Sequence, residues 1–143
     1  LIAAALTDAG YRVVEELLLP DDQKTIEREL INLADRRAVD LILTTGGTGF
    51  APWDITPEAT RAVAERNAPG ISEAIRAYSM QITGRAMLSR GASVIRGRTL
   101  IINLPGSPKA VGETLGYIRP HLAHGLAVLL GSVFDCARPQ DDA

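Results

Sequence analysis

Residues 41–58 of this chain read LILTTGGTGFAPWDITPE, and this stretch is the most informative feature of the sequence. It begins with a short apolar run bounded by turn residues, which is typical of a strand buried on both faces. Three glycines then fall within four positions, at Gly46, Gly47 and Gly49. Because glycine has no Cβ, it allows positive φ and lets a ligand approach the peptide groups closely. The stretch therefore predicts a buried strand that opens into a glycine-rich turn.

The end of the same stretch starts a helix, with Thr56 as the expected N-cap and Pro57 at the first helical position. A turn that leads from a strand to a helix N-terminus suits an anion, because free N–H groups and the positive end of the helix dipole face it. Asp54 stands between the glycines and the helix. We interpret the segment as a ligand-binding loop, and a plain turn that needs positive φ is the alternative.

Two common phosphate-binding motifs do not fit this loop. A P-loop needs a lysine after its last glycine, and no lysine or arginine lies between Arg37 and Arg61. The dinucleotide motif needs a third glycine three residues after its second, and this chain has Pro52 three residues after Gly49. A nucleotide that binds here must do so in a different mode.

The composition is that of an ordinary globular domain. The chain has 143 residues, of which 46% are hydrophobic and 22% charged, and this predicts one domain. A net charge of −2 gives no reason to expect nucleic acid or an anionic membrane as a partner. Cys136 is the only cysteine, so a disulfide framework is excluded, which favours an intracellular, cytoplasmic protein. The apolar runs are far shorter than the ~20 residues of a membrane span.

The rest of the chain alternates between strand and helix patterns. Strands are predicted at 11–19 and in a hairpin at 91–104, and helices at 23–37, 57–67, 70–80, from Pro108 onward, and at 118–130. The hairpin tip with Arg96 and Arg98 is interpreted as solvated. This alternation predicts an α/β fold whose mostly parallel sheet is covered on both sides and gains one antiparallel strand from the hairpin.

The first residues, LIAAALTDAGY, have the pattern of the middle and end of a helix that stops at Gly10. A helix of an α/β domain normally follows another element. Residues 1–143 are therefore expected to form a single domain that lacks its N-terminal strand.

Three predicted loops carry groups suited to a ligand. Parallel strands place the loops that follow them at one edge, where open α/β sheets bind ligands. These loops contain the Asp21–Asp22 pair, the glycines with Asp54, and the sequence PGSPK at 105–109. In the last loop Ser107 is suited to cap a helix, and Lys109 offers a charge to phosphate or carboxylate.

Asp21 and Asp54 together suit Mg²⁺, which prefers oxygen ligands. The alternative assigns Asp21 or its neighbour to an N-cap and Asp54 to an Asx-turn. His121 and His124 are a weaker metal-binding pair, since no third ligand lies near them in sequence. Trp53 either stacks on a planar ring or covers the loop.

Four motifs carry a resemblance to a known family: TTGGTGFAPWDITPEAT at 44–60, PDD at 20–22, NAPG at 67–70, and LSRG at 88–91 with NLPGSPKA at 103–110. They occur in order over nearly the whole chain and resemble the MoaB/Mog family of molybdopterin-binding proteins. The resemblance implies a three-layer α/β/α fold, usually a homotrimer, that binds molybdopterin. It also implies a strand before the first helix, which these residues do not include.

The catalytic members of this family use Mg²⁺ and ATP to adenylylate molybdopterin and release pyrophosphate, with other molybdenum-cofactor enzymes as partners. The resemblance implies that Asp21 and Asp54 are catalytic and that Asp54 binds the metal. It assigns ligand binding to Thr45, Gly46, Gly47, Thr48 and Gly49, and to Pro105, Gly106, Ser107 and Lys109. Two alternatives remain: a non-catalytic molybdopterin-binding or oligomerisation module, and the related domain of a molybdate-insertion enzyme.

Overall fold

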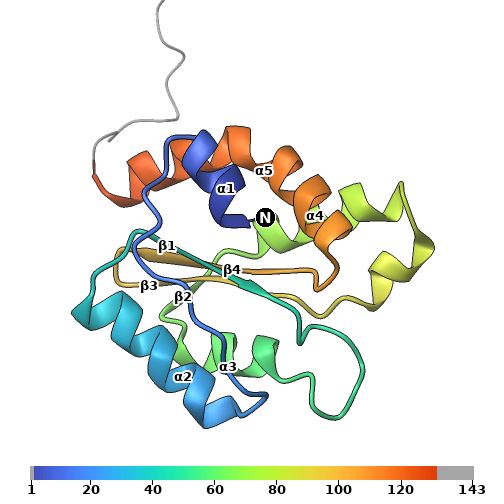
Figure 1. The fold of residues 1–143 in the computed structure, drawn as a ribbon, viewed down its shortest axis with the longest axis horizontal. Helices are drawn as coiled ribbons and strands as arrows, with labels where there is room; N and C mark the ends of the chain where they lie inside the picture. The colour runs from blue at the N-terminus through green and yellow to red at the C-terminus, as the bar shows by residue number, and fades with distance from the viewer. Residues whose placement is uncertain (1, 132–143) are drawn as a thin grey trace, which may run out of the picture.

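A four-stranded mixed sheet forms the middle layer of the structure, a computed structural model that describes residues 2–131 (Figure 1). The strands are β1 (Leu41–Thr45), β2 (Arg66–Asn67), β3 (Ser93–Arg96) and β4 (Thr99–Leu104), in the order β1-β4-β3-β2. β1 is parallel to β4, β3 is antiparallel to β4, and β2 is antiparallel to β3. Three strands therefore run in one direction and β3 opposes them, which confirms the predicted mixed sheet.

Helices cover both faces of the sheet, as the three-layer expectation requires. α1 (Ile2–Asp8), α4 (Pro69–Met80) and α5 (Pro108–Leu129) lie on one face, and α2 (Gln23–Ile31) and α3 (Thr56–Val63) on the other (Figure 1). α2 continues into a π-helical segment, η1 (Asn32–Arg36), and a 3₁₀ helix, η2 (Gly84–Leu88), follows α4. None of the helices within residues 2–131 is long and apolar enough to cross a bilayer.

Strand β4 holds the two halves of the core together, and all six of its residues are buried. Side chains alternate across a strand, so Leu100, Ile102 and Leu104 pack against α4 and α5. Ile101 faces the other way and packs with α2 and α3. Full burial of such a side chain contributes about 1.5–3 kcal/mol.

Helix α5 differs from the prediction, because it is one helix of 22 residues rather than two. Pro120 lies inside the helix and is exposed, away from the sheet. A continuous apolar stripe at helical spacing crosses the predicted boundary and packs on the sheet, which favours one helix over two. This stripe consists of Val111, Leu115, Ile118, Leu122 and Leu126.

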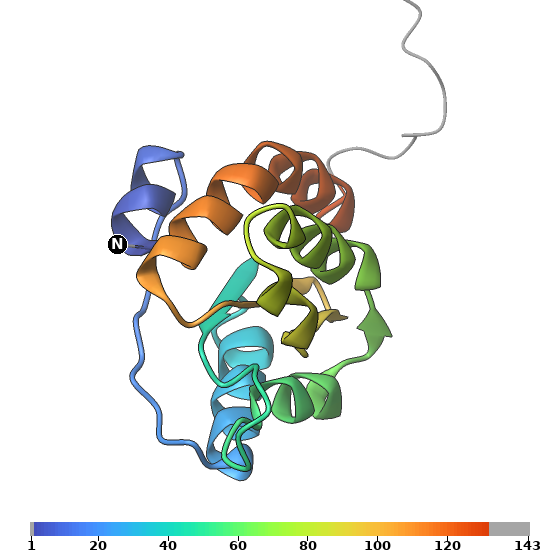
Figure 2. The same cartoon turned by 90° about the vertical axis from the view of Figure 1, so that its right-hand side faces the viewer.

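The strand predicted at 11–19 is wrong: these residues form neither helix nor strand. They run down one side of the molecule from α1 to α2 (Figure 2). A groove of about 1090 Å³ is lined by this segment on one side and by β1 on the other. A β-branched sequence forms a strand only where another strand pairs with it. Within residues 2–131 no strand lies beside this segment, so its β-propensity is not realised.

Several element boundaries also differ from the prediction. α3 begins at Thr56 itself and ends at Val63, after which the chain turns extended at Ala64 and forms β2 within the predicted helix 57–67. The hairpin of β3 and β4 is confirmed, with Gly97 at φ 57° in its tip. Arg96 is not solvated as expected, because it pairs with Asp35 at 2.8 Å. Gly10 ends α1 as predicted, and Cys136 lies outside the described residues.

Candidate functional site

The carboxyl ends of β1 and β4 lie side by side, because their parallel pairing places Thr45 opposite Leu104. The loops that follow these strands therefore start at the same edge of the sheet, as the sequence predicts. The loops also touch: a Cβ on Gly106 would lie 3.3 Å from Cα of Gly46. Two glycine-bearing segments that are sixty residues apart in sequence form one surface.

The glycines after β1 are required by backbone geometry. Gly46 and Gly47 adopt φ of 81° and 68°, in the region that side chains other than glycine rarely occupy. A Cβ on Gly47 would overlap the hydroxyl of Thr56, whose N–H donates to the Gly47 carbonyl at 3.2 Å. The turn thus folds back onto the first residue of α3. Gly49 is needed for space, since a Cβ there would lie 2.9 Å from Oδ2 of Asp54.

Asp54 closes the loop that contains it. Its Oδ2 accepts a hydrogen bond from the N–H of Ala51 at 2.9 Å, and its own N–H donates to the Ala51 carbonyl at 2.9 Å. The side chain accepts from a residue that precedes it, so the arrangement is not the Asx-turn considered above. Like an Asx-turn, it closes a local turn of the backbone. Oδ1 of Asp54 has no partner among the described residues, so it is available to a ligand.

The two neighbouring aspartates before α2 have different roles. Asp22 is the N-cap, and its carboxylate accepts from the hydroxyl and the N–H of Thr25. These hydrogen bonds, the hydroxyl first, lower the pKa of Asp22. Asp21 is exposed and has no hydrogen bond or ion pair with any other residue in 2–131. The cap is therefore assigned to Asp22, and the carboxylate of Asp21 is free.

One groove collects several of the predicted site residues. The residues at the sheet edge that line it are Asp21, Thr45, Gly46, Gly47 and Gly106. The other predicted residues lie outside its lining: Thr48, Gly49, Asp54, Pro105, Ser107 and Lys109. Asp21 and the glycine turns therefore line the same groove, whereas Asp54 lies outside its lining.

Ser107 and Lys109 occupy the start of α5. Oγ of Ser107 accepts from the N–H of Ala110 at 3.2 Å, which confirms the predicted cap. The side chain of Lys109 is 84% exposed, and its ammonium lies 3.9 Å from the carboxylate of Glu113 one turn later. A pair of this length and exposure is weak, so Lys109 is free to contact a ligand.

Two residues that the sequence did not identify shape this edge. The side-chain amide of Asn103, buried in β4, donates to Thr44 and Thr60 at 2.9 Å and accepts from the N–H of Ala92 at 3.0 Å. It thereby connects β1, α3 and the segment before β3. Arg90 contacts the glycine-rich loop directly. A lone asparagine in an apolar strand is a signal for the first, and the LSRG motif at 88–91 contains the second, although the sequence assigns no role to it.

The donor groups suit Mg²⁺ better than a metal held by protein alone. No group of three or more His, Cys, Asp or Glu side chains within residues 2–131 is placed to hold an ion. His121 lines an apolar groove between α4 and α5, which gives the histidine pair no support. Mg²⁺ commonly takes one or two carboxylates together with substrate phosphates. Asp21 and Asp54 each offer a carboxylate oxygen that has no partner in residues 2–131, and of the two only Asp21 lines the groove.

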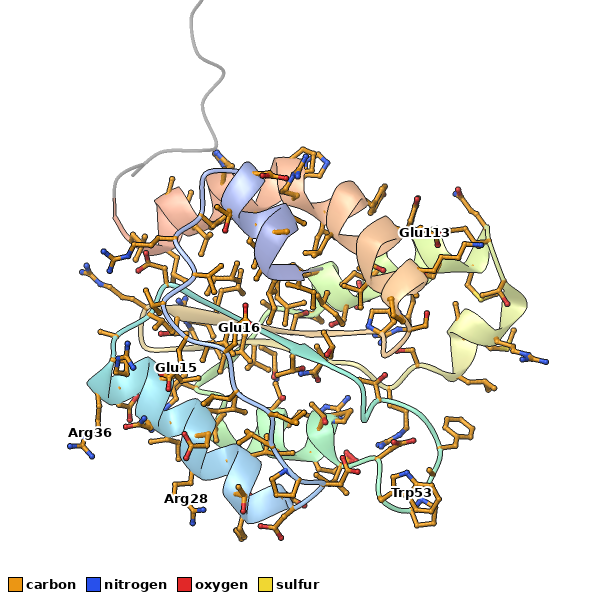
Figure 3. The ribbon with its side chains drawn as sticks, in the orientation of Figure 1. Glu15, Glu16, Arg28, Arg36, Trp53 and Glu113 are labelled. Atoms are coloured by element: carbon orange, nitrogen blue, oxygen red, sulfur yellow. The ribbon has the colours of Figure 1, made fainter. Side chains whose placement is uncertain are left out.

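Trp53 lies at the outer end of the loop, turned away from the sheet (Figure 3). Its side chain is 63% exposed. Among the described residues no other ring stacks on it. Both sequence interpretations of Trp53 therefore remain predictions.

Comparison with known proteins assigns this architecture to a family. The family model described as "Probable molybdopterin binding domain" matches residues 1–124. The chain is 51% identical over 111 residues to a molybdopterin adenylyltransferase from Haemophilus influenzae, which covers 78% of this chain and 55% of that protein. It is 49% identical over 121 residues to the molybdenum cofactor synthesis protein cinnamon of Drosophila melanogaster, with 82% and 20% covered.

A solved structure confirms the fold. The crystal structure of the molybdopterin biosynthesis enzyme MoaB from Thermus thermophilus superposes with a TM-score of 0.86 at 45% identity, over 94% of this chain and 84% of that one. The chain spans about half of the length of the Haemophilus relative and a fifth of the Drosophila relative.

Proposed function

The chain belongs to the family of molybdopterin-binding domains, and we propose that it forms the active domain of a molybdopterin adenylyltransferase in molybdenum cofactor biosynthesis. The substrates are ATP and molybdopterin. An oxygen of the terminal phosphate of molybdopterin bonds to the α-phosphorus of ATP. The bond from that phosphorus to the bridging oxygen breaks, and pyrophosphate leaves.

The observation that carries this proposal is the contact between the two glycine loops beside the free carboxylate of Asp21. Two polyanions must be held together against their charge repulsion. Backbone N–H groups at the glycine turns and the starts of α3 and α5 supply partial positive charge, and Lys109 supplies a full one. Phosphoryl transfer depends mainly on such positioning and electrostatics, so a covalent nucleophile is unnecessary.

Mg²⁺ is the proposed cofactor, and Asp21 and Asp54 are the residues that would hold it. When bound, the ion would neutralise phosphate charge at the reaction centre. The chain's own residues orient the substrates. The loop after β1 fixes one substrate, and the 105–109 loop fixes the other against it.

An assay of pyrophosphate release with molybdopterin and Mg-ATP on the full-length protein tests this function. Release that requires both substrates supports the transferase. Binding of molybdopterin without turnover would favour the non-catalytic module. The domain of a molybdate-insertion enzyme is a further candidate, since the Drosophila relative matches over a fifth of its own length.

The proposal includes a homotrimer in the cytoplasm, where ATP is available, with other molybdenum-cofactor enzymes as partners. Large apolar side chains are exposed around η2 and on α5, and association would cover them. These are Met80, Ile82, Met87, Leu88 and Tyr117. Light scattering that gives a mass near 15.3 kDa at micromolar concentration would contradict the trimer.

We also propose that the N-terminal strand expected from the sequence fills the groove between residues 11–19 and β1. The groove is about 1090 Å³ in volume and runs along the free edge of β1, where backbone groups are available for pairing. A strand placed there would pair with β1 and with residues 11–19. The sheet would then continue on that side.

A further inference from the structure

Arg90 joins the two ends of the loop at residues 48–54. Its Nε donates to the carbonyl of Gly49 at 2.8 Å, and its Nη2 donates to the carbonyl of Asp54 at 2.6 Å. The backbone N–H of Arg90 donates to the carbonyl of Thr48 at 2.8 Å. Three carbonyls of one loop therefore accept hydrogen bonds from a single residue that lies 36 or more positions away from each.

The same side chain ties the loop to α3. Nη1 of Arg90 contacts both carboxylate oxygens of Glu58, at 2.7 and 3.0 Å. Glu58 lies in the first turn of α3, directly after the loop. Hydrogen bonds between charged partners are about twice as strong as neutral ones. The loop and the helix start are thus fixed to one another by one guanidinium group.

The backbone around Arg90 is itself held in place by two other arginines. Arg76 on α4 donates to the carbonyl of Gly91 at 2.8 Å, which fixes the segment that carries Arg90. Arg61 on α3 donates to the carbonyl of Arg90 at 3.2 Å. The backbone that carries the Arg90 side chain is therefore fixed by hydrogen bonds to α3 and α4.

We propose that Arg90 is a positioning residue that holds the 48–54 loop in the conformation that presents Asp54 and the N–H of Gly49 to the ligand. This inference rests on the proposed function for its effect on turnover. Ordering a loop that has no regular secondary structure costs conformational entropy at every residue, so fixed contacts are needed to hold one conformation. A planar guanidinium can satisfy two carbonyls and a carboxylate at once, whereas the ammonium of lysine cannot match that arrangement.

Trp53 provides a direct readout of the loop. It is the only tryptophan in the chain and lies, in sequence, between Gly49 and Asp54, whose carbonyls accept from the side chain of Arg90. In Arg90→Ala, the fast component of its fluorescence anisotropy decay should grow, because the loop moves more freely. Arg90→Lys should give a smaller change of the same sign. The affinity for Mg-ATP, measured by calorimetry, should fall about 10- to 100-fold in Arg90→Ala.

Arg98→Ala is the matched control. It removes an exposed arginine whose side chain has no hydrogen bond or ion pair with another residue in 2–131. Its Trp53 anisotropy should stay close to that of the unsubstituted protein. Free guanidinium ion should partly restore the anisotropy and turnover of Arg90→Ala, and ammonium ion should not. Circular dichroism melts on all variants separate loop ordering from global unfolding.

Unchanged Trp53 anisotropy and Mg-ATP affinity in Arg90→Ala would overturn the inference. An equal change in Arg98→Ala would also overturn it, because the effect would then be due to the general loss of a positive charge. If the unsubstituted protein releases no pyrophosphate, the proposed transferase activity fails. The anisotropy measurements would still decide whether Arg90 orders the loop.

Discussion

Gly106 and Gly46 lie so close that a Cβ on Gly106 would be 3.3 Å from Cα of Gly46. Gly46 follows β1, and Gly106 follows β4. The contact is between backbone atoms, which cannot rotate away as a side chain can. The relative position of the two ligand loops is therefore set by main-chain packing.

Gly106→Ala should separate the two loops and weaken the binding of ATP and molybdopterin. Extra atoms in a packed contact typically cost about 1–3 kcal/mol, and here the strain falls on the loops. Calorimetric titration measures the affinity, and thermal melting measures the stability. Gly112→Ala is the control, since nothing lies within 4 Å of its added Cβ in α5. It should stabilise the helix by ~0.5–1 kcal/mol. Equal ligand affinity in both variants would contradict the prediction.

Lys109→Ala should weaken the binding of phosphorylated ligands without loss of fold. Its side chain is 84% exposed and contributes little packing, and a hydrogen bond to a charged group is worth about 1.5–3 kcal/mol. Calorimetry with ATP and molybdopterin is the measurement. Arg36→Ala is the control. Arg36 lies in η1, beyond the end of α2, and its side chain points outward (Figure 3), so this variant should bind ATP and molybdopterin with unchanged affinity. If both variants bind equally well, Lys109 is only a surface charge.

The sequence predicted the parts of the site that depend on local rules. Positive φ at Gly46 and Gly47, the cap at Ser107 and the hairpin all follow from residue type and spacing. The shared sheet edge follows from parallel pairing. These features need no knowledge of distant contacts.

The remaining features depend on tertiary contacts. Residues 11–19 have strand propensity, but pairing decides whether a strand forms, and no partner lies beside them in 2–131. Asp21 and Asp22 are equivalent cap candidates in the sequence, and the hydrogen bonds from Thr25 select Asp22. Arg90 donates to backbone carbonyls in a loop far away in sequence. Every residue has such a carbonyl, so the sequence does not indicate which of them will accept.

Asp35→Asn should lower the thermal stability at neutral pH. Asp35 accepts from Nε and Nη2 of Arg96 at 3.0 and 2.8 Å, and these hydrogen bonds lower its pKa. A carboxyl with a lowered folded-state pKa stabilises the fold above its unfolded pKa of about 3.9 and loses that effect as pH falls through its folded-state pKa. The difference in melting temperature between the two proteins should therefore shrink on acidification.

Melting curves at pH 7 and at pH values below about 3.9 test this dependence. Asp8→Asn is the control, because Asp8 is exposed and its side chain has no hydrogen bond or ion pair with another residue in 2–131. Its melting temperature should follow that of the unsubstituted protein at each pH. A constant difference for Asp35→Asn across the range would show that the Arg96 contact is not the cause.

Amide hydrogens of residues 12–19 should exchange with solvent much faster than those of Leu100–Leu104. The first group donates no backbone hydrogen bond to another described residue, whereas β4 is paired on both sides. Hydrogen exchange by mass spectrometry gives both rates in one experiment. Slow exchange at 12–19 in the 143-residue chain would contradict an unpaired segment. Protection that appears only in a protein with the N-terminal strand would support the filled groove.

Asp54→Asn should abolish adenylyl transfer and leave molybdopterin binding largely intact. A carboxylate near phosphates repels them unless a cation lies between, so the loss should also appear as altered Mg²⁺ dependence. Asparagine keeps an oxygen that can accept from the N–H of Ala51, so the loop and the melting temperature should be preserved. Pyrophosphate release, calorimetry and thermal melting measure the three quantities.

Asp21→Asn should produce the same loss of turnover. Comparison with the same substitution at Asp22 distinguishes the loss of a ligand-binding charge from the loss of a helix cap. Asp21 has no partner in the described residues, so its substitution should not change stability. Asp22→Asn is the control: asparagine is as good an N-cap as aspartate, so α2 and turnover should both be retained.

Full turnover in Asp54→Asn would reduce Asp54 to a loop-closing residue. Unfolding of that variant would make its role structural, and the non-catalytic binding module would then be favoured over the transferase.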